Sequence, residues 1–456
     1  MLGVILEKKR YCLGFEYTLN FGSKGEYKGT MKPQNFEEKI VWYYIIGTYG
    51  WYLLGLQYTL VPVIAWSLTI YLGKKLWNQP ENTPTEEKIT IPFAVWVWAV
   101  SMLIMEVALI VSHIDFDLGL GKIVSSSILF ATQWALFVLF PLIGSCLNIR
   151  PQLFYRAACI LCLQSLVFIA ICYLAMALHL PASLYTSPFR FIARDSTNFY
   201  SVSLYDLEPT FGGAEASRPR LELFTPWPPA LGLVANIYFF LTYQESNKKW
   251  RLIGMVGAIA MILVSLSRLS MLCLPAVLLL VWIFTNFSKP ITQITAGILS
   301  FFAGIFATAI INFIEIFRNK FDQARPASSK VRSTLGEIAL DRWWQEAPLW
   351  GHGLNEPGAK LVEGMPIGSH HTWFGLLFMK GLVGLIALVF PFLWTFLELL
   401  SKVKNSVGRV SLSILLILFF FCFAENIDVL AYLYWPGLVM IGIAFKQTVL
   451  PRRNYP

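Results

Sequence analysis

The sequence predicts an all-α fold, that of a polytopic integral membrane protein whose helices cross the bilayer many times. Three observations carry this prediction. Hydrophobic residues make up 56% of the 456 residues and charged residues only 14%, whereas ordinary soluble domains are about 25% charged. The apolar residues gather in runs close to the about 20 residues that a membrane-spanning helix needs. The basic residues fall mostly in the short segments between these runs, as is typical of membrane proteins.

Eleven apolar runs follow one another along the chain, and the first of them decides the number of spans. That run is too long for one span and barely long enough for two, because a helix rises about 1.5 Å per residue. A break at GTYGW and at Pro62 allows a tight hairpin inside it. We therefore expect eleven or twelve transmembrane helices. The runs cover residues 40–72, 91–113, 122–146, 152–180, 223–243, 250–266, 269–287, 290–316, 372–397, 409–423 and 428–446.

Lysine and arginine indicate which loops face the cytoplasm, because cytoplasmic loops carry an excess of both. The opposite loops include two long segments and the short acidic turns DFDLG and ENID. A twelve-span arrangement also leaves the basic N-terminal segment inside. The loops expected in the cytoplasm carry Lys74, Lys75, Arg150, Lys248, Lys249, Arg251, Lys289, Lys402, Lys404, Arg409, Arg452 and Arg453.

This topology divides the chain into six regions, with two large loops on the extracytoplasmic side. A site built from those loops works where no nucleotide is available. The regions are a cytoplasmic N-terminal segment (1–39), N-terminal transmembrane helices (40–180), a first large loop (181–222), central transmembrane helices (223–316), a second large loop with an interfacial helix (317–371), and C-terminal transmembrane helices with a short cytoplasmic tail (372–456).

The overall charge and the cysteines indicate no further partner. The formal net charge is +9, which would suggest nucleic acid in a soluble protein, but the positive-inside bias already explains these residues. None of the seven cysteines has metal-ligand spacing to a histidine. We therefore predict no nucleic-acid partner, no disulfide and no metal site.

Arginines in the outward segments point to an anionic ligand. Solvated loop charge would explain each of them singly, but Arg268 lies in VSLSRLSML, where almost no aqueous loop is left between two apolar runs. An arginine at membrane depth is costly unless an anionic group meets it. Several fork-shaped, permanent cations on one side suit a phosphate or pyrophosphate. The outward arginines are Arg190, Arg194, Arg218, Arg220, Arg268, Arg318, Arg325, Arg332 and Arg342.

Two features of the second large loop and one carboxylate are further candidates for a site on the extracytoplasmic side. Helical spacing from Leu335 to Glu346 predicts a helix lying on the membrane interface. The following PLWGHGLNEPG predicts a turn in which glycines allow close backbone approach, with a plain loop as the alternative. Glu425, in CFAENIDVL, is a candidate acceptor of a proton or a helix-end residue in a short turn.

Two of the five histidines, His370 and His371, stand together just before a long apolar run. A histidine at a helix start is often a cap. Combined with outward arginines and a glycine turn, the pair predicts a polar group that reaches into an anionic substrate site.

The run HHTWFGLLFMKGLVG, with His370, Trp373 three positions later and Gly381 eleven positions later, resembles the motif that opens the helix after the large periplasmic loop in the O-antigen ligase and Wzy-type polymerase superfamily. His371 stands where that family usually has asparagine. PLWGHG at 348–353 and Arg332 resemble the preceding turn and arginine. RLELFTPWPPALG from Arg220 and LSRLSML resemble two earlier segments, so the likeness covers about residues 218–397.

The resemblance implies a GT-C-like glycosyltransferase in the bacterial inner membrane, with its active site facing the periplasm. Such an enzyme takes glycan from a polyprenyl-pyrophosphate-linked oligosaccharide and uses neither a nucleotide sugar nor a metal or other cofactor. A polymerase, the favoured interpretation, transfers the glycan to a carrier-linked repeat unit. A ligase, the alternative, transfers it to a lipid A core or another acceptor. Membrane lipid and a chain-length regulator protein complete the expected partners.

Seven residues form the predicted site. We expect the catalytic residues to be His370, Arg332 and Arg268, with the arginines on the pyrophosphate and His370 acting as a hydrogen-bond donor or a base. A transporter of lipid-linked or anionic solutes is the competing interpretation, but the sequence shows neither internal repeats nor broken mid-membrane helices. The predicted substrate-binding residues are Arg220, His371, Arg218 and Glu425.

Overall fold

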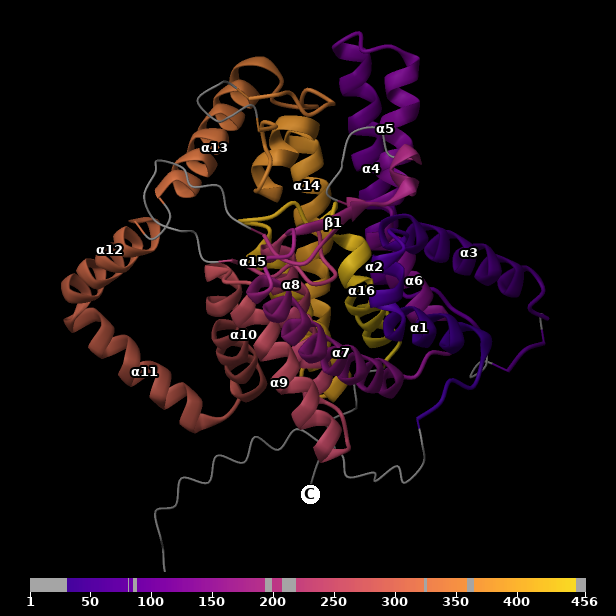
Figure 1. Ribbon diagram of the computed structural model, residues 1–456, viewed down its shortest axis with the longest axis horizontal. Coiled ribbons are helices and arrows are strands. Elements are labelled where there is room, and N and C mark those ends of the chain that lie inside the picture. The colour runs from indigo at the N-terminus through magenta and orange to yellow at the C-terminus, as the bar shows by residue number, and fades with distance from the viewer. Residues whose placement is uncertain are drawn as a thin grey trace, which may run out of the picture.

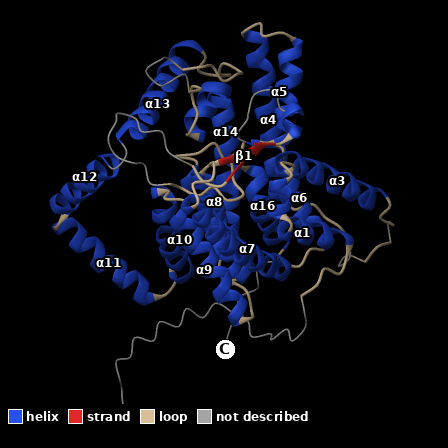
Figure 2. Cartoon of the chain, in the orientation of Figure 1, coloured by secondary structure: helices blue, strands red, loops and turns tan. Residues whose placement is uncertain are grey.

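The computed structural model describes residues 31–80, 82–84, 88–192, 199–206, 219–323, 326–358 and 365–447. Almost all regular structure in these residues is helical, and one small two-stranded sheet lies among them. Figures 1 and 2 show the helices gathered into a bundle, with the sheet near its middle. The prediction of an all-α polytopic membrane protein is confirmed, since several helices are long and apolar enough to cross a bilayer.

The first part of the bundle contains seven helices. They are α1 (Phe36–Ile46), α2 (Thr48–Leu53), α3 (Gln57–Trp77), α4 (Phe93–Asp115), α5 (Leu120–Thr132), α6 (Leu136–Cys146) and α7 (Pro151–Ala177).

The remaining elements start with the small sheet of the first large loop. They are β1 (Ser183–Thr186), the short 3-10 helix η1 (Pro188–Ile192), β2 (Ser201–Ser203), α8 (Pro228–Tyr243), α9 (Lys248–Val264), α10 (Arg268–Asn286), α11 (Pro290–Ile305), α12 (Ala307–Gln323), α13 (Pro326–Glu346), α14 (Thr372–Ser401), α15 (Ser406–Phe421) and α16 (Ala431–Lys446).

Local sequence explains where several helices begin. Some start at a side chain that accepts a hydrogen bond from a backbone N–H of the first turn, which would otherwise lack a partner. Others start with a proline, whose fixed φ suits the first helical position. The caps include Asn35, Asn247, Ser267 and Asn405, and the prolines are Pro151, Pro228 and Pro290.

Among the described residues, fewer helices are long enough to span a bilayer than the eleven or twelve that were predicted. Each predicted apolar run contains helix, but five described stretches are long and apolar enough to cross a membrane, or six with one bent pair. Helices α8, α15 and α16 have 16 residues each and α9 has 17, against the about 20 that a span needs. Both α8 and α16 are buried along almost their whole length, so neighbouring helices surround them in place of lipid.

The first apolar run breaks at the start of GTYGW, as predicted, but not at Pro62. The chain turns at Gly47 and again at residues 54–56, whereas Pro62 lies inside α3. Gly55 has a φ of 66° and its Cα faces Ser187, so a side chain there would collide with the 3-10 turn. The turn therefore forms at the glycine, where a positive φ is tolerated.

Close contact between α6 and α16 forms the centre of the bundle. A Cβ at Gly144 would lie 2.1 Å from the carbonyl oxygen of Val439, and one at Gly442 would lie 2.2 Å from that of Pro141. The two backbones therefore touch at small residues, as is typical of helix packing in membranes. Large aromatic side chains fill the space around this contact, including Phe140 stacked on Trp435.

Helices α11 and α12 form an arm that stands away from the bundle (Figure 1). The sequence predicted one span at 290–316, but α11 and α12 meet at an angle of 81° and α12 continues to Gln323. Thr292 is the one buried residue of α11. Large apolar side chains such as Phe301 and Phe313 are about two thirds exposed, which suits a lipid surrounding. A uniformly apolar run contains no signal for such a bend.

Candidate functional site

The predicted histidine pair lies at the start of α14, where the chain is fastened to the connection between α15 and α16. The hydroxyl of Thr372 donates to the carbonyl oxygen of Glu425 at 2.6 Å and accepts from the N–H of Ile427 at 3.1 Å. The N–H of Thr372 donates to the carbonyl oxygen of Cys422 at 2.9 Å. Glu425 is therefore held beside the histidines, as the sequence suggested.

The structure gives the two histidines different surroundings. His371 caps α14, because its Nδ1 accepts from the N–H of Phe374, and its ring stacks on the Phe374 ring with centroids 3.8 Å apart. His370 has a positive φ of 62°, which costs a non-glycine residue about 1 to 3 kcal/mol. Strained backbone of this kind is concentrated at functional sites, so the geometry favours His370 over His371 as the acting group.

Arg332 of α13 reaches this end of α14 through a small apolar contact. A Cβ at Gly336 would lie 2.9 Å from the Phe374 ring, so the glycine allows the two helices to approach closely. Burial and the charge of Arg332 lower the pKa of His370 to about 4. The imidazole is therefore neutral near pH 7, and the guanidinium lies close enough to act on it.

Glu425 lies between two of the predicted arginines. Its side chain is 2% exposed, and its Oε2 accepts a hydrogen bond from Nε1 of Trp227 at 3.0 Å. Burial raises the pKa of Glu425 to about 6, while Arg332, Trp227 and Arg220 oppose this rise. The structure thus brings Arg220, Arg332, His370 and Glu425 to one place from four segments of the chain.

The turn between α9 and α10, which leads to Arg268, contacts this group through Arg220. Nε of Arg220 donates to the carbonyl oxygen of Ser265 at 3.3 Å, and the N–H of Leu221 donates to that of Val264 at 3.1 Å. Arg268 is the first residue of α10, directly after its cap Ser267. The Arg268 side chain is partly buried against the bundle and is not fully exposed.

Three helices begin at this site. Trp227 precedes α8 and contacts Glu425, His371 caps α14, and α10 begins at the turn that contacts Arg220. The N-terminus of a helix carries a partial positive charge and exposes backbone N–H groups. Together with the arginines, these ends form a region that favours an anionic ligand. We call this region, defined by Arg220, Arg268, Arg332, His370 and Glu425, the helix-start site.

Comparison with known families agrees with the resemblance. The O-antigen ligase family model matches residues 231–389, which run from α8 into α14. This stretch of the chain is therefore similar to the O-antigen ligase family. This match supports the resemblance to the O-antigen ligase and Wzy-type polymerase superfamily. No curated protein matches the chain. The matched residues contain Arg268, Arg332 and both histidines, while Arg220 and Glu425 lie outside them.

Within the matched residues, the predicted glycine turn forms hydrogen bonds with the backbone of α14 at a break in that helix. Gly381 has φ 60° and ψ −162°, so the helix is interrupted there. The N–H groups of His352 and Gly353 donate to the carbonyl oxygens of Phe378 and Met379, at 2.8 and 2.9 Å. In return the N–H of Leu382 donates to the carbonyl oxygen of Pro348 at 2.9 Å. The turn thus supplies the hydrogen bonds that the break removes, as backbone inside a membrane protein requires.

Both glycines of the turn are needed for this contact. A Cβ at Gly351 would lie 2.4 Å from the N atom of Lys380, and one at Gly353 would lie 2.8 Å from Nδ1 of His113. Both have positive φ. The close backbone approach that the sequence predicted for PLWGHG is therefore present, and its partner is the break in α14.

A buried cluster of charged residues around Lys380 could not be recognised from the sequence. Lys380 is 4% exposed and Asp428 is 6% exposed, and Lys380 lies within the electrostatic reach of Asp428 and of Glu106 in α4. Its Nζ also lies over the rings of Phe130 and Trp134, at 5.6 and 5.9 Å from their centroids. Ionisable groups inside a bundle are expensive and often functional. The lysine was overlooked because it lies in an apolar run.

Glu222 is a second residue that the sequence did not single out. It lies two positions after Arg220, and burial with the neighbouring Asp206 raises its pKa to about 8, against the opposing charge of Arg220. Glu222 is therefore protonated near pH 7 and does not cancel the positive charge of the helix-start site.

The other outward arginines do not join the site within the described residues. Arg342 forms ion pairs with Glu346 and Glu356, so it ties α13 to the following loop. Arg190 is exposed in η1. The predicted substrate-binding residue Arg218, with Arg194 and Arg325, lies outside the described residues.

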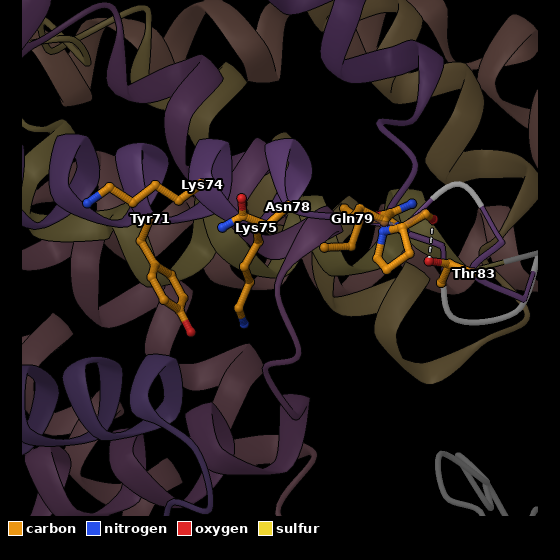
Figure 3. A pocket seen from close by; sticks show the side chains of 8 residues that line it. Tyr71, Lys74, Lys75, Asn78, Gln79 and Thr83 are labelled. Carbon is orange, nitrogen blue, oxygen red and sulfur yellow. Dashed lines mark hydrogen bonds between the residues drawn. The ribbon is translucent and has the colours of Figure 1, made fainter.

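A cavity of about 490 Å³ lies at the end of α3, and its lining residues are outside the residues that the family model matches. Figure 3 shows Tyr71, Lys74, Lys75 and Asn78 along its wall. It shares no residue with the helix-start site, and Lys75 pairs with Glu37, so its lysines are part of the local structure.

Proposed function

We propose that the protein is a Wzy-type polysaccharide polymerase, a membrane glycosyltransferase that moves glycan from a polyprenyl-pyrophosphate carrier to an acceptor sugar hydroxyl. The family match supports an O-antigen ligase or polymerase type of membrane enzyme. The observation that carries the finer proposal is that Arg220, Arg332 and three helix starts lie around Glu425 and a neutral histidine.

The arginines and helix starts would hold the donor pyrophosphate. Arg220, Arg268 and Arg332 reach the region from separate segments, so they can surround a diphosphate on several sides. As the bond between the anomeric carbon and the pyrophosphate oxygen breaks, negative charge grows on the leaving group. Fixed cations and backbone N–H groups stabilise this charge, and such preorganised electrostatics is usually the largest catalytic contribution.

His370 would accept the proton of the attacking hydroxyl. Its pKa of about 4 keeps the ring neutral before the donor binds, so its lone pair is available. The acceptor oxygen forms a bond to the anomeric carbon, the carrier pyrophosphate leaves with the bonding electrons, and the proton passes to the imidazole and then to water. Glu425 is the less favoured base, because Trp227 already donates to its carboxylate.

The proposed site faces the periplasm from the bacterial inner membrane. Helix α14 begins at the helix-start site and ends next to Lys402 and Lys404, which belong to a basic loop of the cytoplasmic set. The donor and the carrier-linked repeat unit would then both be delivered outside the cytoplasm. A chain-length regulator protein is a further partner of such a polymerase.

A transfer assay tests the proposal. Purified protein is incubated with a defined polyprenyl-pyrophosphate oligosaccharide, without a nucleotide sugar, both with and without a metal chelator, and products are separated by size. We expect a ladder in the wild type and none in Arg332→Gln. Lys330→Gln is the matched control, since Lys330 is an exposed cation two residues away on α13. No transfer to any acceptor would refute the enzyme proposal.

The family description itself favours a second function. Because the matching model is that of an O-antigen ligase, transfer to a lipid A core is the alternative. Single transfer that requires an added lipid A core, without a ladder, would replace the polymerase by the ligase.

A further inference from the structure

A cavity of about 430 Å³ lies at the end of the bundle opposite the helix-start site. Its volume falls in the range of about 300 to 1,000 Å³ that holds small ligands. It is enclosed by the last turn of α8, the second half of α10 and the first turns of α15. Helices α8 and α10 begin at the helix-start site, so the cavity lies about 24 Å away along the 16 residues of α8.

The lining changes from polar to apolar along the helices. Tyr243 and Gln244 at the end of α8 meet Arg409 at the start of α15, and Arg409 and Tyr243 interact electrostatically. Deeper in the bundle the wall is apolar. Its main side chains there are Leu278 and Leu279, which are 41% and 58% exposed. The cavity therefore opens sideways, where lipid chains lie in a membrane protein.

Trp282 marks the boundary between the two parts of the cavity. It lies one turn before the end of α10, and aromatic side chains of this kind gather at the level of lipid headgroups. Arg409 lies at a similar level, because it is four residues after Asn405, the cap of α15. A phosphate next to Arg409 would thus be at headgroup depth, with an acyl chain descending along the leucines.

Basic residues surround this end of the bundle. They lie in the first turn of α9 and in the connections that join α10 to α11 and α14 to α15, while α8, α10 and α15 line the cavity. Such clusters attract acidic lipids and identify this face with the cytoplasmic leaflet. The residues are Lys248, Lys249, Arg251, Lys289 and Lys404, whereas Lys402 is buried and its Nζ donates to Glu398 and to the carbonyl oxygens of Ala444 and Phe445.

We propose that this cavity binds an acidic phospholipid of the cytoplasmic leaflet. Arg409 holds the phosphate, Tyr243 and Gln244 contact the headgroup, and one acyl chain lies on Leu278 and Leu279. The site is separate from the proposed transferase site, because the two lie at opposite ends of the same helices. The proposal therefore stands whether or not the transfer assay succeeds.

Native mass spectrometry of the detergent-solubilised protein tests this site. The protein is titrated with phosphatidylglycerol or with phosphatidylcholine of the same acyl chains. We expect a retained phosphatidylglycerol adduct whose affinity falls about fivefold in Arg409→Gln, equivalent to about 1 kcal/mol for one basic residue at the membrane surface. The matched control is Lys88→Gln, which removes an exposed cation from another loop of the cytoplasmic set and should keep the wild-type affinity.

A second variant fills the apolar part without changing charge. Leu278→Trp should also lose the phosphatidylglycerol adduct. This variant tests the lipid site even if Arg409→Gln does not fold. Equal adducts in wild type and both variants, or equal binding of phosphatidylcholine, would overturn the proposal. Displacement of the lipid by millimolar inorganic phosphate would show an anion site without lipid selectivity. Tighter binding of a polyprenyl phosphate would assign the cavity to the carrier lipid, against the proposal.

Discussion

Replacing His370 with asparagine separates the chemistry of the imidazole from the fold around it. His370 sits at a φ of 62°, and asparagine is one of the few residues that adopt this conformation readily. His370→Asn should therefore leave the free energy of unfolding within about 1 kcal/mol of the wild type, because the strain of about 1 to 3 kcal/mol is kept or reduced. What it removes is a side chain able to accept a proton.

The expected loss of activity follows from the state of the ring. With a pKa of about 4, about one His370 ring in a thousand is protonated at pH 7, so nearly every molecule has a free base. General-base catalysis contributes about 100- to 10,000-fold. We therefore expect kcat for glycan transfer to fall by about that factor in His370→Asn, measured as product formed per minute at saturating donor.

His371→Asn is the matched control for this experiment. Asparagine is a good N-cap, so it preserves the start of α14 while removing the second imidazole and its stacking on Phe374. We expect transfer within about threefold of the wild type, since other bases remain in place. Transfer by His370→Asn within tenfold of the wild type, or a larger loss in His371→Asn, would refute the assignment of His370 as the base.

Three further predictions use the same protein. The acid limb of the pH profile of kcat/KM should lie near pH 4, where His370 gains its proton, and not near pH 6, where Glu425 gains one. The value of kcat/KM should rise with pH through this limb, because the base must be neutral. Lys380→Met should lower the free energy of unfolding by about 3 to 5 kcal/mol, since it leaves buried carboxylates without their cation. Adding Asp428→Asn should restore much of the lost stability. Gly351→Ala should lower the free energy of unfolding by about 2 kcal/mol or more. Gly351 has a positive φ, and a Cβ there would lie 2.4 Å from the backbone of α14.

Each of these predictions has an outcome that contradicts it. A limb near pH 6 that disappears in Glu425→Gln would make Glu425 the base. A double variant at Lys380 and Asp428 no more stable than Lys380→Met would mean that the two charges do not compensate each other. Gly297→Ala is the control for the glycine, because open space surrounds Gly297; an equal effect of both alanines would remove the claim of close packing.

Much of the architecture could be predicted because a bilayer imposes strong constraints. Backbone groups in lipid must be satisfied within a helix, so each long apolar run formed one or more helices. The breaks were harder to predict. Gly381 and the bend after α11 lie inside long, mostly apolar runs. The hydrogen bonds at the Gly381 break come from a turn about 30 residues earlier in the chain.

The sequence predicted which kinds of residue form the candidate site better than it predicted which of them lie close together. Arginines facing outward are unusual enough to be noticed, and the structure brings Arg220 and Arg332 to Glu425. Sequence alone could not distinguish Arg332 from Arg342, whose two glutamate partners are evident only in the fold. Lys380 was missed because a lone cation in an apolar run shows its partners only after helices pack.

The claim that the helix-start site holds a pyrophosphate is tested most directly by binding. The affinity of the purified protein for a polyprenyl pyrophosphate and for the matching monophosphate is measured in the wild type, in Arg332→Gln and in Lys330→Gln. We predict tighter binding of the pyrophosphate, weakened about 10- to 100-fold in Arg332→Gln, as expected for a charged hydrogen bond of about 1.5 to 3 kcal/mol, and unchanged in Lys330→Gln. Equal affinity for the two lipids, or an unaltered affinity in Arg332→Gln, would contradict it.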